Sequence, residues 1–295
     1  MMLRVVRYRY LWFGFSFLLV AGGLVFLLLG GLHLGTDFTG GSLLQVQFDE
    51  RMTPAVADIE KLLSDNGYLD TRVQSAGEKN VIIRTKQLNA DRHTKLTDVL
   101  KGKYGKIEEV SYSEVGPTLG RELQQKAILA VVLVLVGIIL YISWAFRKSA
   151  GQISGWAFGI NAFIALIHDV GITLGAFAFL GYVFHIEIDA LFVTALLTVL
   201  GFSVHDTIVV FDRIREGLRR HPNDQLVDII DRSVNETLVR SINTSLSTLL
   251  VLVALYFFGG QTIRYFVLAL IVGILIGTYS SIFLASPLLP YWRKK

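Results

Sequence analysis

Residues 190–211 read ALFVTALLTVLGFSVHDTIVVF, an apolar stretch that carries one acidic residue, Asp206. A helix of this length crosses the roughly 30 Å of hydrocarbon in a bilayer, because it rises about 1.5 Å per residue. An ionised side chain inside such a helix costs about 2.5–3.5 kcal/mol on insertion scales. Residues of this kind usually face the interior of a helix bundle and mark a path for ions or protons. The stretch therefore predicts a membrane helix with a functional carboxylate.

Further apolar runs surround this stretch in a chain of 295 residues that is 53% hydrophobic, with a mean hydropathy of +0.53. Runs without acidic or basic side chains span 10–36, 127–146, 241–263 and 265–292, and a run at 151–186 is interrupted by His168 and Asp169. Each is long enough to span a membrane, so the sequence predicts six transmembrane helices. The absence of cysteine excludes disulfide and thiol chemistry.

These runs divide the chain into three parts. We expect an N-terminal tail and first transmembrane helix at 1–34, an extracytoplasmic domain at 35–121, and a bundle of the second to sixth helices at 122–295. The five helices of the bundle are expected at about 126–146, 153–182, 188–211, 240–259 and 264–289.

The polar segment between the first two helices has its own pattern. A strand at 42–48, a helix ending near Asn66, strands at 72–76 and 81–85, a helix at 90–104 and a strand at 107–115 give the order β-α-β-β-α-β, the ferredoxin-like arrangement. Its 14 acidic and 13 basic residues (37–126) make it nearly neutral, which is unlike a nucleic-acid-binding surface. We therefore predict a small α+β domain and no nucleic-acid partner.

Basic residues cluster beside the first helix, after residue 146, at 213–220 and at the C-terminus, whereas 181–189 contains no Lys or Arg. The positive-inside rule then places both termini in the cytoplasm and the polar segment on the far side of the membrane.

A second charged residue, Arg240, opens the run that ends near Phe258. Asp206 lies in the cytoplasmic half of its span, and Arg240 lies near the cytoplasmic start of the next, so we expect the two to pair. Movement of the arginine would let the carboxylate bind or release a proton, which makes the pair a candidate proton relay. The alternatives are a static structural ion pair or an arginine that reaches the headgroups.

Other polar residues in the spans are candidate supporting residues. They are His168, Asp169, Ser203, His205, Asn243 and Thr244. None shows the spacing of a metal site, and no nucleotide-binding motif or nucleophile elbow is present. We expect no metal, no cofactor and no enzymatic activity.

One motif resembles a known family. The sequence Asp37-Phe38-Thr39-Gly40-Gly41, directly after the first helix, resembles the signature of the SecD/SecF proteins. Three further stretches, at 115–120, 201–216 and 240–245, are similar to the SecF members in particular. The resemblance covers essentially the whole chain, in order.

The resemblance implies six transmembrane helices of RND type and a periplasmic ferredoxin-like domain. It implies an accessory subunit of the Sec protein-export machinery in the inner (plasma) membrane, which pairs with SecD and uses the proton motive force to promote preprotein translocation. Expected partners are SecD, the SecYEG channel, a YajC-type subunit, SecA indirectly, the translocating preprotein and the lipid bilayer. The family associates the positions of Asp206 and Arg240 with proton transport.

We also expect hinges at the two junctions between the helices and the outside domain, because their glycines allow backbone angles that other residues resist. The alternative is a simple connection between strand and helix. The family motif and hinge candidates are eight residues. These are Asp37, Phe38, Thr39, Gly40, Gly41, Gly116, Pro117 and Gly120. One departure is visible at His205, where the family commonly has Asn. Two alternatives stay open: an RND-type proton-coupled exporter of small molecules or lipids, and a structural assembly subunit with no proton role.

Overall fold

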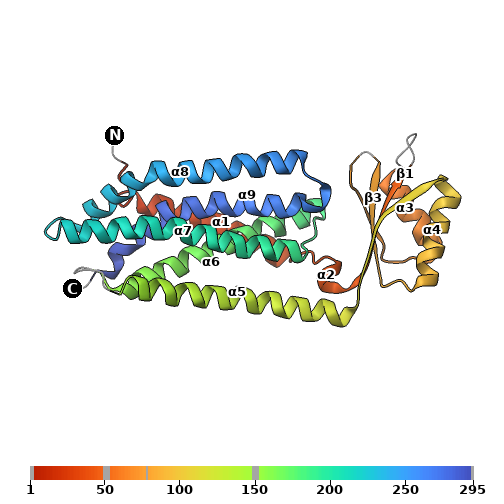
Figure 1. Cartoon of the computed structure of the whole chain (residues 1–295), viewed down its shortest axis with the longest axis horizontal. Coiled ribbons are helices and arrows are strands. Elements are labelled where there is room, and N and C mark those ends of the chain that lie inside the picture. Colours follow the sequence, from red (N-terminus) through yellow and green to blue (C-terminus); the bar gives the residue numbers. More distant parts are fainter. Residues whose placement is uncertain (1–2, 49–53, 78, 148–152, 294–295) are drawn as a thin grey trace. The chain divides into compact units, whose positions relative to one another are not determined.

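The computed structural model describes residues 3–48, 54–77, 79–147 and 153–293 (Figure 1). The chain forms two compact units. A helical unit contains residues 1–33 and 128–295, and a smaller unit contains residues 34–127.

The helical unit is built on six long helices. They are α1 (Arg9–Leu29), α5 (Pro117–Ala145), α6 (Gly155–Phe184), α7 (Ala190–Arg220), α8 (Leu226–Phe258) and α9 (Gln261–Ser280). Six spans of the described chain are long and apolar enough to cross a membrane, which confirms the six predicted helices and a multi-pass membrane protein. The described chain begins and finishes at the same end of this unit (Figure 1).

The sixth span is not one regular helix. After α9 it continues through a π-helical turn, η1 (Ser281–Ala285), a short α10 (Ser286–Leu288) and a 3₁₀ turn, η2 (Leu289–Trp292). Pro287 and Pro290 follow the π-helical turn, and each lacks the N–H that a regular helix would use. The hydroxyl of Ser286 donates to the carbonyl of Ser281 over 2.9 Å, which ties the residue after the π-helical turn to the first residue of that turn.

Three helices extend beyond the predicted bounds, because hydropathy marks only the lipid-facing part of a helix. The helix expected at 188–211 runs on to Arg220, and the one expected at 240–259 begins at Leu226. α5 likewise starts at Pro117, well before residue 126, and includes a charged first segment. Proline suits the first turn of a helix, where its missing N–H would have no partner.

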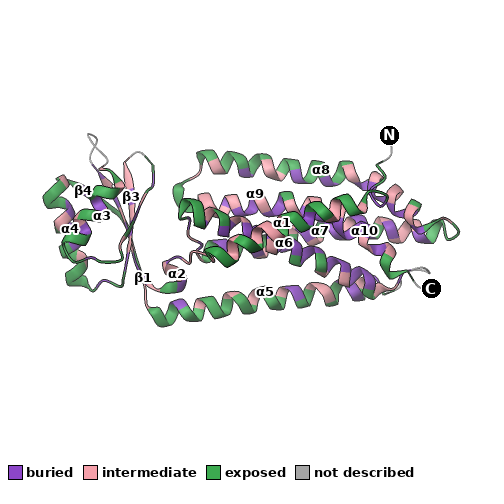
Figure 2. Cartoon of the chain, turned by 180° about the vertical axis from the view of Figure 1, so that it is seen from behind, coloured by how far each residue is buried: buried purple, intermediate pink, exposed green. Residues whose placement is uncertain are grey.

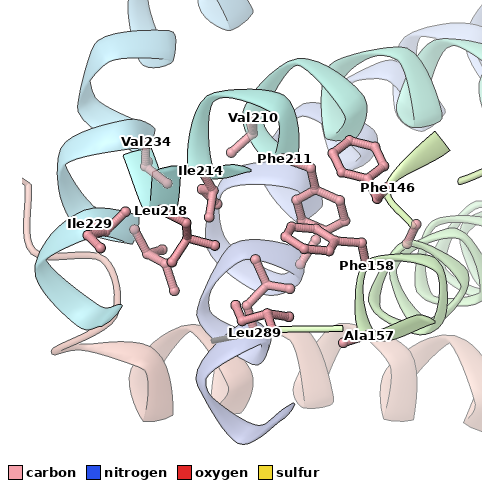
Figure 3. Packing of buried hydrophobic residues seen from close by; sticks show 14 of the residues in the cluster. Phe146, Ala157, Phe158, Val210, Phe211, Ile214, Leu218, Ile229, Val234 and Leu289 are labelled. Carbon is pink, nitrogen blue, oxygen red and sulfur yellow. The ribbon is translucent and has the colours of Figure 1, made fainter. Parts of the chain in front are cut away.

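The extensions of α7 and α8 are held together by a buried apolar cluster. Ile214 and Leu218 of α7 pack with Ile229 and Val234 of α8, and all four side chains are buried (Figure 3). Arg213 also pairs with Glu236 across the two helices. The segment after residue 222, which contains polar residues, is therefore the first part of α8.

Close helix crossings depend on glycine. A Cβ on Gly23 of α1 would lie 2.9 Å from the Cα of Gly175 on α6, and a Cβ on Gly277 of α9 would lie 2.9 Å from the Cβ of Ser203 on α7. Small residues at such crossings let helix backbones approach. By contrast, α1, α5 and α8 expose much apolar surface along their length (Figure 2), which suits lipid or a partner subunit.

The smaller unit has the predicted β-α-β-β-α-β order after a short α2 (Thr36–Thr39). Its elements are β1 (Gly41–Phe48), α3 (Val56–Asp65), β2 (Arg72–Ser75), β3 (Asn80–Thr85), α4 (Ala90–Tyr104) and β4 (Ile107–Val115). The strands form an antiparallel sheet in the order β2-β3-β1-β4. This order confirms the ferredoxin-like prediction.

The core of the smaller unit lies between the sheet and its two longer helices. Leu44 and Val46 of β1 are buried at alternate positions, as expected for a strand with one covered face. They belong to one apolar cluster with Ile59 of α3 and with Leu96 and Leu100 of α4.

Candidate proton-binding site in the helical unit

Asp206 lies on α7 with 7% of its surface exposed. Its Oδ1 atom accepts a hydrogen bond of 2.5 Å from the hydroxyl of Ser241 on α8. Its Oδ2 atom accepts one from the hydroxyl of Ser281, the first residue of the π-helical turn. The carboxylate therefore joins three segments of the bundle through hydroxyl donors.

A second carboxylate, that of Asp169 on α6, is completely buried. Its Oδ2 atom accepts hydrogen bonds from the hydroxyls of Ser203 on α7 (2.6 Å) and Ser280 on α9 (2.8 Å). The Nδ1 atom of the adjacent His168 lies 2.9 Å from its Oδ1 atom. Burial of a charge is expensive unless polar groups compensate it, and these three groups supply that compensation.

Three consecutive residues at the junction of α9 and the π-helical turn connect these groups. Tyr279 stacks on the ring of His168 with centroids 6.3 Å apart, Ser280 binds Asp169, and Ser281 binds Asp206. The Tyr279 hydroxyl also donates to the carbonyl of Trp12 on α1 over 3.0 Å. The end of α9 is thus the element on which the polar groups of the bundle converge.

The local geometry of α9 explains how it comes so close. Gly273 and Gly277 face α7: a Cβ on Gly273 would lie 2.2 Å from Cγ2 of Val199, and Gly277 lies against Ser203. The absence of side chains at these two positions lets α9 approach α7 and Asp169.

Chemically, the arrangement consists of two carboxylates surrounded by hydroxyl donors inside an apolar bundle. Within residues 3–48, 54–77, 79–147 and 153–293, no group of three His, Asp or Glu side chains is arranged to hold a metal ion. A buried carboxylate of this kind can bind and release a proton.

The expected pair between Asp206 and Arg240 is not formed in this structure. Arg240 is exposed on α8, and the next residue, Ser241, contacts Asp206 in its place. Consecutive residues of a helix point about 100° apart, so only one of these two can face α7. Ser203, one of the candidate supporting residues, donates to Asp169 and not to the carboxylate one turn away on its own helix.

The other supporting candidates divide into two groups. His168 and Asp169 belong to the buried cluster. His205, Asn243 and Thr244 are exposed, whereas Asp206 beside His205 is buried.

The glycine motif lies in the smaller unit, where its two parts pack against each other. Gly40 has a φ of 75°, and a Cβ there would lie 2.8 Å from the Cα of Pro117. A Cβ on Gly120 would lie 2.8 Å from the carbonyl oxygen of Phe38, whose side chain is buried. Gly116, in contrast, has no neighbouring atom within 4 Å of such a Cβ.

Comparison with known proteins identifies the family. The family described as "Protein export membrane protein SecD/SecF, C-terminal" matches residues 95–295, and the "SecD/SecF GG Motif" matches residues 25–50. The chain belongs to the SecD/SecF family.

Relatives within the SecD/SecF family resemble the chain over nearly all of its length. It is 46% identical to a "Protein translocase subunit SecF" of Thermobaculum terrenum, with 100% of this chain and 95% of the relative covered. It is 39% identical to the protein of the same description from Anaerolinea thermophila, with 99% and 94% covered.

Solved SecDF structures share the fold. The crystal structure of SecDF from Thermus thermophilus, described as a translocon-associated membrane protein, superposes with a TM-score of 0.87 at 31% identity. A SecDF structure in a "Super-membrane-facing form" gives a TM-score of 0.71 at 30% identity. Each match covers 99% of this chain but only 39% of the SecDF chain.

In this SecD/SecF family member, sequence reasoning missed Ser241, Ser280 and Ser281. A signal was present, because Ser280 and Ser281 form a pair of adjacent hydroxyl residues within the mostly apolar run 265–292. Single serines in membrane helices commonly bond their own backbone, which makes them weak indicators of function.

Proposed function

We propose that this chain is the SecF-type subunit of the Sec protein-export machinery. It pairs with SecD in the inner (plasma) membrane, with both termini in the cytoplasm, and promotes preprotein translocation by using the proton motive force. Its role is mechanical coupling and not enzymatic catalysis. Asp206 is the proton-binding group, and Arg240 is the charge that responds to it.

The observation that carries the proposal is the buried Asp206 carboxylate within a fold shared with SecDF proteins. A carboxylate held by hydroxyls on α8 and on the π-helical turn is positioned to link a protonation change to helix packing. π-helical turns in α-helices are frequently found at functional sites. Protonation changes the hydrogen bonds that the carboxyl group can form with these hydroxyls. We expect this change to favour one of two packings of the bundle over the other.

The proposed pairing with SecD agrees with the coverage of the solved SecDF chains, of which this chain matches 39%. Arg240 is exposed on α8, as are many apolar side chains of that helix, among them Ile242, Leu246 and Leu250. An exposed arginine beside an apolar face fits a surface that a partner subunit covers. We propose the SecYEG channel and a YajC-type subunit as further partners, with SecA acting earlier.

The test is gradient-dependent translocation in vesicles that contain SecYEG, SecA, the cognate SecD and this chain. Asp206→Asn and Arg240→Met are compared with the wild type and with Asp212→Asn. Asp212 is a matched control, because it lies on the same helix and forms an exposed pair with Arg215 at 2.5 Å.

If the proposal is correct, the Asp206 and Arg240 variants assemble with SecD but lose the gradient-dependent component, and the Asp212 variant keeps it. Assembly with unchanged translocation in both test variants would instead identify the chain as a scaffold. Failure to assemble would assign the two residues a structural role and contradict their part in the proposal.

A further inference from the structure

The two buried carboxylates lie on different helices but share one supporting element. Ser280 binds Asp169, and its neighbour Ser281 binds Asp206. Ser203 adds a second link, because it precedes Asp206 by one turn on α7 and donates to Asp169 over 2.6 Å. Asp169 is therefore bound by α7, the helix that carries Asp206, and by the end of α9, which continues into the turn that binds Asp206.

Both serines of this pair have a second acceptor within reach. The Oγ atom of Ser280 lies 3.1 Å from the carbonyl oxygen of Gly277, and the Oγ atom of Ser281 lies 3.0 Å from that of Thr278. A hydroxyl has one proton to donate and rotates to suit its surroundings. Each serine can therefore donate to a carboxylate or to its own helix without leaving a buried donor unpaired.

This choice of acceptors is what a carboxylate with a changing charge requires. An ionised carboxylate only accepts hydrogen bonds, whereas a protonated one carries an O–H that must itself donate. A serine whose only acceptor was the carboxylate would lose its partner when the proton arrived, at a cost typical of an unsatisfied buried group. The alternative carbonyl removes that cost at both sites.

We propose that Asp169 is a second proton-binding carboxylate of this chain, and that Ser280 and Ser281 are the rotating hydroxyls that couple it to Asp206. On binding, hydronium transfers a proton to a carboxylate oxygen and becomes water, and the paired serine turns its own O–H to the backbone carbonyl. Release reverses both changes and returns the proton to water. This proposal extends the proposed function by adding a second site to the one at Asp206.

The groups around Asp169 are consistent with this role. The titratable side chains recorded beside it are His168, on its own helix, and Tyr279, which stacks on His168 from α9; α7 contributes the neutral Ser203. His168 is 8% exposed, and its buried Nε2 atom has no hydrogen-bond partner in the described part of the chain. An unpaired imidazole nitrogen next to a buried carboxylate is a further place where a proton or a water molecule can bind. Near Asp206, the neighbouring His205 is exposed, and no ion pair of Arg240 is recorded among the described residues.

The experiment is pH-difference infrared spectroscopy of the full chain together with SecD in lipid vesicles, which reports protonated carboxyl groups directly. The variants are Asp169→Asn, Asp206→Asn, Ser280→Ala and Ser281→Ala. Ser143→Ala is the matched control, because Ser143 is buried on α5 and its hydroxyl has no hydrogen-bond partner among the described residues. Asparagine has nearly the shape of a protonated aspartate, so the carboxamide variants are expected to keep the fold.

We expect Asp169→Asn and Asp206→Asn to remove two different carboxyl bands. Ser280→Ala should change the proton affinity of the Asp169 group by about three- to tenfold, and Ser281→Ala should do the same for the Asp206 group, since each loses one hydrogen bond. Ser143→Ala should change neither. This one-to-one pattern is not expected of serines that only fill space.

Two results would overturn the proposal. One is an unchanged set of carboxyl bands in Asp169→Asn; the other is an equal effect of Ser280→Ala and Ser281→Ala on both groups. The outcome is separable from the translocation test. If the Asp169 band titrates and Asp206→Asn still supports gradient-dependent export, only the proposed function is refuted. If Asp206→Asn loses gradient-dependent export and no Asp169 band titrates, only the second site is refuted.

Discussion

Ser241 donates a hydrogen bond of 2.5 Å to Asp206 and thereby joins α8 to α7 inside the bundle. The residue before it, Arg240, is exposed. A single step along α8 thus separates the hydroxyl that satisfies the buried carboxylate from the charge expected to pair with it. The buried carboxylate is therefore held by neutral hydroxyl donors and not by an ion pair.

The first prediction concerns the donors to Asp206. Ser241→Ala and Ser281→Ala each remove one donor from a buried acceptor, and each should lower the free energy of unfolding by about 1–3 kcal/mol. Denaturant unfolding of the purified chain in micelles measures the change. Ser143→Ala removes a buried hydroxyl without a recorded partner and should change the stability less. Equal losses in all three variants would show that the effect comes from packing alone.

A second prediction tests the crossing of α1 and α6. Gly23→Ala places a methyl group 2.9 Å from the Cα of Gly175, so the two backbones must separate. Overpacking of this kind typically costs about 1–3 kcal/mol. Gly22→Ala is the matched control, because nothing lies within 4 Å of the added atom. Gly23→Ala should therefore unfold at a lower temperature than Gly22→Ala. Equal transition temperatures would contradict the close crossing of α1 and α6.

A third prediction separates packing from flexibility in the glycine motif. Gly120→Ala should destabilise the smaller unit by about 1–3 kcal/mol, because the methyl group meets the carbonyl oxygen of Phe38 at 2.8 Å. Gly116→Ala meets no atom within 4 Å and should leave stability unchanged. Hydrogen exchange of 34–127 and translocation measured on the same variants provide the test. A translocation defect in Gly116→Ala with normal protection would identify residue 116 as a hinge.

The fourth prediction is a loss of stability of the smaller unit at high pH. Burial raises the pKa of Tyr68 above its ordinary value, and its hydroxyl donates to the carbonyl of Arg92 over 2.8 Å. Because the folded pKa is raised, its contribution to stability is complete below the unfolded pKa of about 10. It is lost as the pH rises through the folded value.

A difference titration of tyrosinate absorbance between the wild type and Tyr68→Phe measures this group. The absorbance component that the wild type shows and Tyr68→Phe lacks should titrate above pH 10. Unfolding of the smaller unit should be less sensitive to high pH in Tyr68→Phe than in the wild type. A component that titrates at or below the ordinary tyrosine pKa would refute the argument.

The sequence by itself determined the number of membrane helices and the ferredoxin-like order of the smaller unit. Both follow from local patterns: apolar length decides whether a segment crosses a bilayer, and alternation or helical spacing decides the elements of a small domain. It also singled out Asp206 and Asp169, because a carboxylate in an apolar run is costly wherever the run folds.

Only the tertiary structure decided which groups meet these carboxylates. Ser280 lies 111 residues from Asp169, and Ser281 lies 75 residues from Asp206. Their contacts depend on the close approach of α9 at Gly277 and on the π-helical turn that begins at Ser281. The same applies to Arg240, whose exposed direction was set by the packing of α8 and not by its place in the sequence. The hydropathy of a segment indicates what it costs to bury a charged residue there. Which partner offsets that cost depends on how each helix is rotated about its axis and on the distance between helix axes.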